Sequence, residues 1–449
     1  MTGILQAAAF WVSNKGGSNG RKLYFYFYLL FTLVSMVVGN DPVILSGTVF
    51  LVYYTTATGL HPISWLISEF AAANTASMVL FVGNPTNVVI CEGFGINIAA
   101  FTAYTILPFF TCSVACYVAL MFQFRDAKYV PRKLSGTEKL DVLSVLNDPV
   151  SAIFGSILLL ICLTVMIVLS FFHVDVWKVV LPFAVAKFIF DVCWDQYRYK
   201  KGPVVQEKDK TTSEDPINAA LSRATTIPSD LERRATHSSD ETRSSYSAAR
   251  DEAFTSGIMS SALSRGLHSS LRPRFNSAHK SLSAHFPTFM TALPRLPFTL
   301  IPFAFSQFIL IEALSHQGWI DVFANWLVKA TNGHTIPTIW IIGVLGVTMC
   351  NVSGTSIGAT ILLTKVVRAA QLSNQSTRAA AIALAVASNI GAVSFTFSAS
   401  LAGLLWKAIL TGKGISMWQT TFAFWNMLPL LAMTGVGLAI VSAEMAVLY

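Results

Sequence analysis

Charge is scarce in this chain of 449 residues. Asp, Glu, Lys and Arg make up 12% of it, hydrophobic residues make up 53%, and the mean hydropathy is +0.58. Ordinary soluble domains carry about 25% charged residues, so the composition excludes an average soluble protein. A membrane helix needs about 20 mostly apolar residues. Stretches that approach or reach this length recur at 23–38, 43–60, 99–122, 151–172, 176–194, 296–314, 336–350, 377–393 and 418–443.

These stretches predict an all-α integral membrane protein with about nine to eleven membrane segments, some of them broken. The N-terminus lacks the basic region that precedes the apolar core of a signal peptide, so we expect membrane insertion through the internal spans. Basic residues gather in the loops between apolar spans, a pattern typical of cytoplasmic loops. The net charge of +8 therefore does not indicate nucleic-acid binding, and we expect a lipid bilayer, most simply the plasma membrane, as the surroundings.

The sequence also lacks the usual signatures of metal sites and enzymes. Its six cysteines show neither metal-ligand spacing nor an extracellular disulfide framework, so we expect them to be small buried side chains. The His-Glu-x-x-His and Gly-x-Ser-x-Gly motifs are missing, and no second aspartate matches Asp41 in the apolar segments. We therefore expect no catalytic residues, no metal and no cofactor. The cysteines are Cys91, Cys112, Cys116, Cys162, Cys193 and Cys350.

Residues 195–290 interrupt the apolar pattern with a polar, Ser-rich stretch of mixed charge. Such a segment buries too little apolar surface to fold alone. We interpret it as a disordered cytoplasmic linker between a first membrane repeat, 1–194, and a second, 291–449. A kinase could act on the hydroxyl residues that follow Arg233 and Arg234 and add negative charge there; the alternative is a simple solubilising tether. These hydroxyl residues are Thr236, Ser238 and Ser239.

The second half of the chain echoes the first in three motif pairs, in the same order and at nearly constant offset. "GNDPVILSGTVF" (39–50) pairs with "CNVSGTSIGATIL" (350–362). "ANTASMVLFVGNPTNVVICEGFGI" (73–96) pairs with "SNIGAVSFTFSASLAGLLWKAIL" (388–410). "GFGINIAAFTAYTILPFF" (93–110) pairs with "GKGISMWQTTFAFWNMLPLL" (412–431). Duplicated membrane halves with matching Gly, Pro and Asn interruptions predict a secondary transporter whose binding site lies at the repeat interface.

The interruptions supply the candidate substrate-binding residues. Irregular backbone at membrane depth is tolerated only where it is buried in protein or lines a cavity. Helix ends exposed there favour an anionic or polar guest. An alternative role for the amides around Pro85 is to satisfy the broken backbone. The candidates are Asn40, Asp41, Asn84, Thr86, Asn87, Asn351, Ser353, Thr355, Asn389, Ser398 and Ser400.

Acidic residues are rare enough in the apolar segments to be considered one by one. Asp41 is the most informative, because an ionisable group at membrane depth is by default a functional hypothesis. It could bind a coupling ion or carry a proton, or it could cap neighbouring N–H groups. Glu69 and Glu92 follow apolar stretches, and we expect both to lie nearer a membrane interface.

The motifs resemble the ion transporter superfamily, with its citrate transporter-like domain, and within it the arsenite and antimonite efflux permeases. The first span with its "GNDP" break resembles the Asn-Asp-Gly break of those permeases, and "GNPTNVVI" (83–90) resembles the superfamily signature of a broken helix. "ASLAGLLW" (399–406) resembles their Gly-Ser-Leu-Ala-Thr-Leu-Leu-Trp segment. The resemblance implies inverted repeats, each with a re-entrant hairpin and a broken helix, commonly in a homodimer.

The sequence departs from the permeases at three points. Asn74 and Asn389 stand where the permeases typically have Asp at the starts of the broken helices, and Val393 stands where they have Lys. These losses weaken the expectation of proton coupling. We assign the coupling ion, H⁺ or Na⁺, to Asp41, Asn74 and Asn389. Neither hairpin has the Ser-Asn-Thr tip of sodium-dicarboxylate carriers, and Met1 aligns within the family's second helix, so two scaffold helices are expected to be missing.

The leading hypothesis is a secondary active transporter of a small oxyacid or anion, first of all an arsenite or antimonite efflux protein. The second is a citrate, dicarboxylate or inorganic-anion carrier, since the hairpin chemistry suits any small oxygen-rich guest. An ion channel is disfavoured, because duplicated breaks favour alternating access. An intramembrane enzyme is disfavoured, because the catalytic motifs and a second aspartate to match Asp41 are missing.

Overall fold

The computed structural model describes residues 3–134, 148–172, 176–200, 285–293 and 300–448, together with residues 141, 142, 174, 282 and 298. All regular elements in these ranges are helical, which confirms the all-α prediction there. The first half contains α1 (Ile4–Gly16), α2 (Gly20–Val38), α3 (Asn40–Val43), η1 (Ile44–Thr48), α4 (Val49–Ala57), α5 (Pro62–Ala76), η2 (Phe81–Gly83), α6 (Pro85–Phe94), α7 (Ile98–Gln123), α8 (Pro149–Ser170) and α9 (Val176–Lys200).

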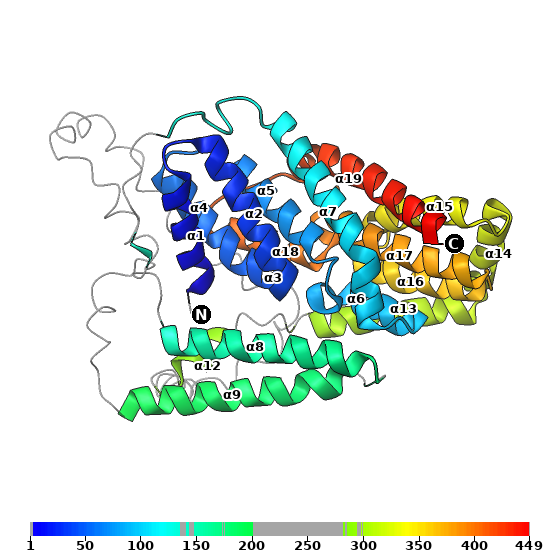
Figure 1. The fold of residues 1–449 in the computed structure, drawn as a ribbon, viewed down its shortest axis with the longest axis horizontal. Coiled ribbons are helices and arrows are strands. Elements are labelled where there is room, and N and C mark those ends of the chain that lie inside the picture. The colour runs from blue at the N-terminus through cyan, green and yellow to red at the C-terminus, as the bar shows by residue number, and fades with distance from the viewer. Residues whose placement is uncertain are drawn as a thin grey trace, which may run out of the picture. The chain divides into compact units, whose positions relative to one another are not determined.

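The remaining helices follow the predicted linker. They are α12 (Pro287–Ala292), α13 (Leu300–His316), α14 (Trp319–Thr331), α15 (Thr335–Val352), α16 (Ser356–Ala369), α17 (Asn374–Gly391), η7 (Phe397–Ala399), α18 (Leu401–Gly412) and α19 (Gln419–Leu448). The chain forms two compact units. The larger contains α1–α8, the start of α9 and α13–α19, and the smaller contains the rest of α9 and α12 (Figure 1).

Five helices of the described residues, α2, α7, α8, α15 and α19, are long and apolar enough to cross a membrane. They support an integral membrane protein. The other predicted spans also coincide with helices, but these are shorter, interrupted or less apolar. The stretch 43–60, for example, is divided among α3, η1 and α4. The count of nine to eleven membrane segments therefore stays a prediction.

The third motif pair has the same local structure in both halves. Each Gly-x-Gly-Ile sequence lies at the turn between a broken helix and a long helix. The second glycine, Gly95 or Gly414, has a positive φ of 63° or 80°, a conformation that other residues adopt with strain. Each long helix then contains a proline, Pro108 in α7 and Pro429 in α19. The inverted relation of the halves, however, stays a prediction.

Small residues allow the central helices of the larger unit to approach closely. α15 packs against α17, α7 against α19, and α2 against α5. α17 carries the buried run 379–387, rich in alanine. A Cβ on Gly346 of α15 would lie 2.8 Å from the Cβ of Ala387. Small residues at a helix contact favour helix association in membranes, because they let the two backbones approach closely.

The described helices extend into the predicted linker at both ends. α9 continues to Lys200 and α12 begins at Pro287, so the outermost residues of the segment 195–290 are helical. Residues 201–281, with the proposed phosphorylation sites Thr236, Ser238 and Ser239, lie outside the described residues. The domain boundaries and the kinase therefore stay predictions.

Candidate functional site

The first broken helix is interrupted between α5 and α6. Regular helix ends at Ala76 and resumes at Pro85, as the sequence predicts. Proline suits this first helical position, because the missing N–H would have no intrahelical partner there. A Cβ on Gly83 would lie 2.2 Å from the carbonyl oxygen of Ser77. Glycine is therefore required for the chain to fold back this tightly. We call residues 77–84 the first break.

The second broken helix has the same plan. α17 ends at Gly391 and α18 begins at Leu401, and we call residues 392–400 the second break. The Ser400 hydroxyl accepts a hydrogen bond of 3.0 Å from the Gly403 N–H and so caps α18. Asn84 caps α6 in the same way, by accepting from the Thr86 N–H at 3.2 Å. Both predicted breaks are confirmed, and each ends in a capped helix N-terminus.

Asn389 joins the two broken helices. It lies fully buried near the end of α17, and its Oδ1 accepts from Ser77 Oγ at 2.9 Å and from Asn84 Nδ2 at 3.2 Å. Its Nδ2 donates to Asn87 Oδ1 at 2.8 Å and to the Ala385 carbonyl at 2.9 Å. The whole hydrogen-bonding capacity of this amide is therefore used. In this conformation Asn389 holds the first break in shape.

The neighbouring predicted residues are also engaged with protein groups. Asn87 Nδ2 donates to the carbonyls of Ser77 and Leu80, both at 2.9 Å. Ser388 Oγ donates to Thr86 Oγ1 at 3.4 Å, a second contact between the two broken helices. These bonds favour the alternative that the amides near Pro85 satisfy the interrupted backbone in this conformation. A guest would have to exchange its own hydrogen bonds for them.

A third interruption separates α2 from α3. Gly39 has φ 86° there, and a Cβ on it would lie 2.9 Å from the Gly83 carbonyl oxygen. This turn therefore touches the first break directly. Asn40 follows it, is buried, and donates from Nδ2 to Asn74 Oδ1 at 3.0 Å. After Asn40 the chain continues as helix through the π-helical turn η1. A re-entrant hairpin here stays a prediction.

The fourth interruption, residues 353–355, separates α15 from α16. Asn351 Oδ1 accepts from the N–H groups of Phe395 and Thr396, at 3.2 and 3.1 Å, and from Thr396 Oγ1 at 3.0 Å. Its Nδ2 donates to Ser394 Oγ. Asn351 therefore anchors the second break.

Two other predicted residues lie in this fourth interruption and bond locally. Ser353 Oγ donates to the Met349 and Thr355 carbonyls at 2.8 and 3.0 Å, while Thr355 caps α16 by accepting from the Ile357 N–H at 3.3 Å. Ser398 of the second break is half-buried and donates to Thr396 Oγ1 at 3.4 Å.

The three acidic residues lie in different surroundings. Asp41 is half-buried on α3, and its carboxylate makes no hydrogen bond or ion pair with the described residues. Glu92 is exposed, as an interfacial residue can be. Glu69 is fully buried within the protein and accepts from Thr48 Oγ1 at 3.0 and 3.1 Å. It is buried because α5 is covered by α2, η1, α7 and other helices, which its sequence does not reveal. The position of both glutamates relative to a membrane interface stays a prediction.

Four hydroxyl residues at the breaks were missed as individual site candidates. All are small and lie in apolar surroundings, so nothing in their local sequence distinguishes them from packing residues. Their signal was position, because each lies within or beside a predicted break. These residues are Ser77, Ser388, Ser394 and Thr396.

A cavity of about 480 Å³ lies between the start of α7 and the start of α17. Asn97, Tyr104, Asn374 and Thr377 contribute polar groups to its lining, and Arg378 contributes a positive charge. The Arg378 guanidinium donates to Tyr104 Oη at 3.5 Å. A pocket with one arginine and several neutral polar groups suits a small anion.

Interrupted helices and apolar spans define the class of the protein: it is an integral membrane protein. Comparison with known proteins agrees. Residues 1–199 match the family model described as "Citrate transporter". The resemblance to the ion transporter superfamily is thereby confirmed for this part of the chain.

Curated relatives carry the name "Arsenical pump membrane protein". The protein of Escherichia coli K12 is 28% identical over 172 residues, which cover 38% of this chain and 40% of the relative. That of Yersinia enterocolitica is 28% identical over 198 residues, covering 41% and 45%. Another from E. coli is 30% identical over 127 residues, covering 28% and 30%. The chain therefore matches less than half the length of these relatives.

Proposed function

We propose that the chain is a secondary active transporter of a small oxyacid or anion, with arsenite or antimonite efflux as its first candidate activity. The observation that carries the proposal is the pair of interlocked breaks, in which Asn389 of α17 bonds to Ser77, Asn84 and Asn87 of the other half. An undissociated oxyacid such as arsenous acid needs neutral donors and acceptors, which these amides and hydroxyls supply. The names of the relatives support this choice of substrate.

Binding of the guest at the breaks would replace hydrogen bonds between protein groups with hydrogen bonds to the substrate. The amides at the breaks, Asn84, Asn87, Asn351 and Asn389, all bond to protein groups, so rearranging a break costs energy that a well-matched guest offsets. Asn84 and Ser400, which cap α6 and α18, would then present the positive helix ends to the guest. The interruption at Asn351 would move together with the second break that it anchors.

A citrate, dicarboxylate or inorganic-anion carrier is the second candidate. The description of the matching family model and the Arg378 cavity favour it. In both cases we place the coupling ion, H⁺ or Na⁺, near the first break, where Asp41 and Asn74 lie on adjoining elements. A homodimer in the plasma membrane, with the linker in the cytoplasm, completes the proposal.

The test is arsenite accumulation in an arsenite-sensitive host that expresses the chain or its Asn351→Ala variant at matched membrane levels. The chain should lower accumulation, and the variant should slow efflux about tenfold, equivalent to ~1.4 kcal/mol. Thr348→Ala is the matched control, because Thr348 is exposed on the same helix and its hydroxyl, among the described residues, donates only to the Val344 and Leu345 carbonyls of that helix. Equal accumulation with and without the chain would refute arsenite efflux. Uptake of radiolabelled citrate by the same cells would then test the second candidate.

A further inference from the structure

Glu69 is a carboxyl group completely buried inside the larger unit. Its side chain lies on α5, two turns of helix from the end that leads into the first break. Of the described residues, none forms an ion pair with it. An ionised carboxylate in such surroundings loses its hydration without a compensating charge, which costs several kcal/mol even after relaxation, by rough estimate. The neutral, protonated form is therefore the stable one in this conformation.

Two polar groups meet the carboxyl, and they come from different halves of the chain. Thr48 Oγ1 lies 3.1 Å from Oε1 and 3.0 Å from Oε2, at the end of the π-helical turn η1. The Trp406 side chain on α18 also acts on the carboxyl. Its indole N–H is buried and makes no hydrogen bond among the described residues. Glu69 thus sits where η1 of the first half and α18 of the second half meet α5.

The local backbone is shaped to admit the carboxyl. A Cβ on Gly47 would lie 3.0 Å from Glu69 Oε1 and 2.9 Å from the Phe31 ring, so only glycine leaves the necessary space. The wider turn of η1 interrupts the α-helical pattern at this contact. Single π-helical turns within helices occur frequently at functional sites and are rare elsewhere.

Among the described residues, no other titratable group pairs with Glu69 to compensate the charge of its ionised form. The elements packed against α5, η1 and α18 do carry charged residues, but among the described residues none of them forms an ion pair or a hydrogen bond with this carboxyl. These residues are Lys15, Arg21, Lys22, Asp41, Arg378, Lys407 and Glu444.

We propose that Glu69 is a proton-binding site, and that its protonation latches η1 to α5 and α18. Protonation converts the carboxylate to a neutral acid that stays buried, with Thr48 as its hydrogen-bond partner and the unpartnered Trp406 indole N–H beside it. When η1 moves away, water reaches the carboxyl, which ionises and releases the proton to that side of the membrane. This inference rests on the proposed transport function and assigns the coupling to a carboxyl that is distinct from Asp41.

The first experiment detects the proton itself and needs no substrate. Infrared spectra of the purified chain and of Glu69→Gln at neutral pH should differ by a carboxylic acid C=O band that only the unmodified chain shows. Deuterium exchange should shift that band slowly, because the group is buried. A spectrum without a carboxylic acid band attributable to Glu69 would overturn the proposal, whether or not arsenite is transported.

The second experiment measures coupling in proteoliposomes, with arsenite as the probe and a pH-sensitive dye in the lumen. The chain should move protons together with arsenite. Glu69→Gln should lower the coupled proton flux at least about tenfold while arsenite still equilibrates down its gradient, now independently of pH. Glu92→Gln is the control, because Glu92 is an exposed carboxylate on α6.

A second variant separates a folding defect from a loss of the proton site. Glu69→Asp keeps an ionisable group and should retain measurable coupling. Unchanged proton flux in Glu69→Gln would overturn the assignment of the proton to Glu69. If the unmodified chain moves no arsenite at all, arsenite transport fails, and the infrared result alone decides on Glu69.

Discussion

The two breaks share a plan but differ in what holds them and in how accessible they are. The first break, 77–84, is bound by Asn389 from the opposite half, and Ser77, Val79 and Phe81 within it are buried. The second break, 392–400, is bound by Asn351 of its own half, and its Phe395 is 36% exposed. The first break is therefore part of the contact between the halves, whereas the second can change shape within one half.

The two breaks come from matching sequence motifs, but this difference indicates that they contribute differently to a conformational change. Separating the halves must break the hydrogen bonds of Asn389, which cost most where no water replaces them. Rearranging the second break disturbs hydrogen bonds within one half, those around Asn351, which is itself half-buried, and the one that Gln419 donates to the Phe395 carbonyl. We therefore expect the second break to open more easily and the first to set the energy of the larger motion.

Alanine at Gly83, in the first break, and at Gly354, in the interruption 353–355, should give the largest contrast. Gly83→Ala places a Cβ 2.2 Å from the Ser77 carbonyl oxygen and should lower the free energy of unfolding by about 3 kcal/mol. Gly354→Ala, beside the anchor of the second break, meets nothing within 4 Å and strains only a φ of 79°, for a loss of about 1 kcal/mol. Thermal midpoints of the purified variants in one detergent measure both. Equal losses would contradict the tighter packing of the first break.

Removing the amide between the halves should have the next largest effect. Asn389→Ala leaves Ser77, Asn84 and Asn87 without a shared partner and should reduce stability by about 2 kcal/mol. Asn374→Ala is the control, since Asn374 is exposed at the start of the same helix. The readout is again the thermal midpoint in detergent. A midpoint equal to that of the control would mean that Asn389 does not hold the first break.

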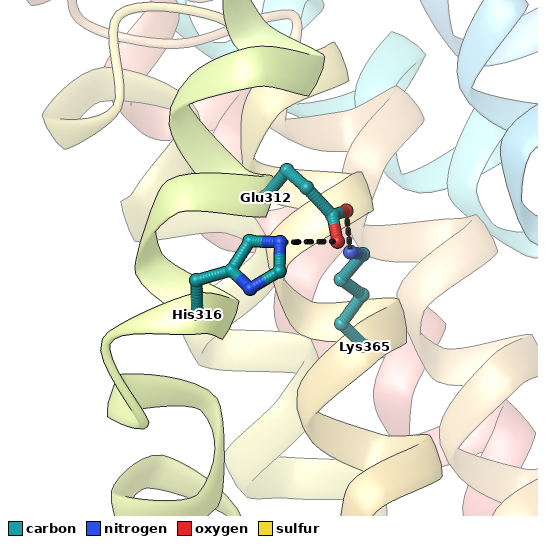
Figure 2. A network of polar contacts seen from close by, with 3 residues as sticks. All are labelled: Glu312, His316 and Lys365. Carbon is teal, nitrogen blue, oxygen red and sulfur yellow. Dashed lines mark hydrogen bonds and ion pairs between the residues drawn. The ribbon is translucent and has the colours of Figure 1, made fainter.

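The smallest effect is expected away from both breaks, at the contact of α13 with α16. Lys365 pairs with Glu312 there, and His316 Nε2 lies 3.8 Å from Glu312 Oε1 (Figure 2). Glu312 and His316 are largely exposed, and exposed ion pairs contribute little to stability. Lys365→Met should leave both transport and the thermal midpoint close to those of the unmodified chain. A marked loss of transport would show that α16 responds to motions that the two breaks do not explain.

The sequence by itself determined the helical class, the apolar spans and the positions of the interruptions. Gly39, Pro85 and Gly354 act through their own backbone conformations, which neighbouring residues suffice to predict. The motif pairs also identified Asn351 and Asn389 as residues beside breaks, before any contact was known.

Only the tertiary structure decided which residues these amides bond to, and that Glu69 is completely buried within the protein. Partners such as Ser77 and Asn389, or Thr48 and Glu69, lie on different elements, so their pairing depends on how whole helices pack. A glutamate after an apolar stretch has the same local sequence whether it reaches an interface or an interior. Burial depends on the covering helices, because solvation is a property of the assembled fold and not of the segment.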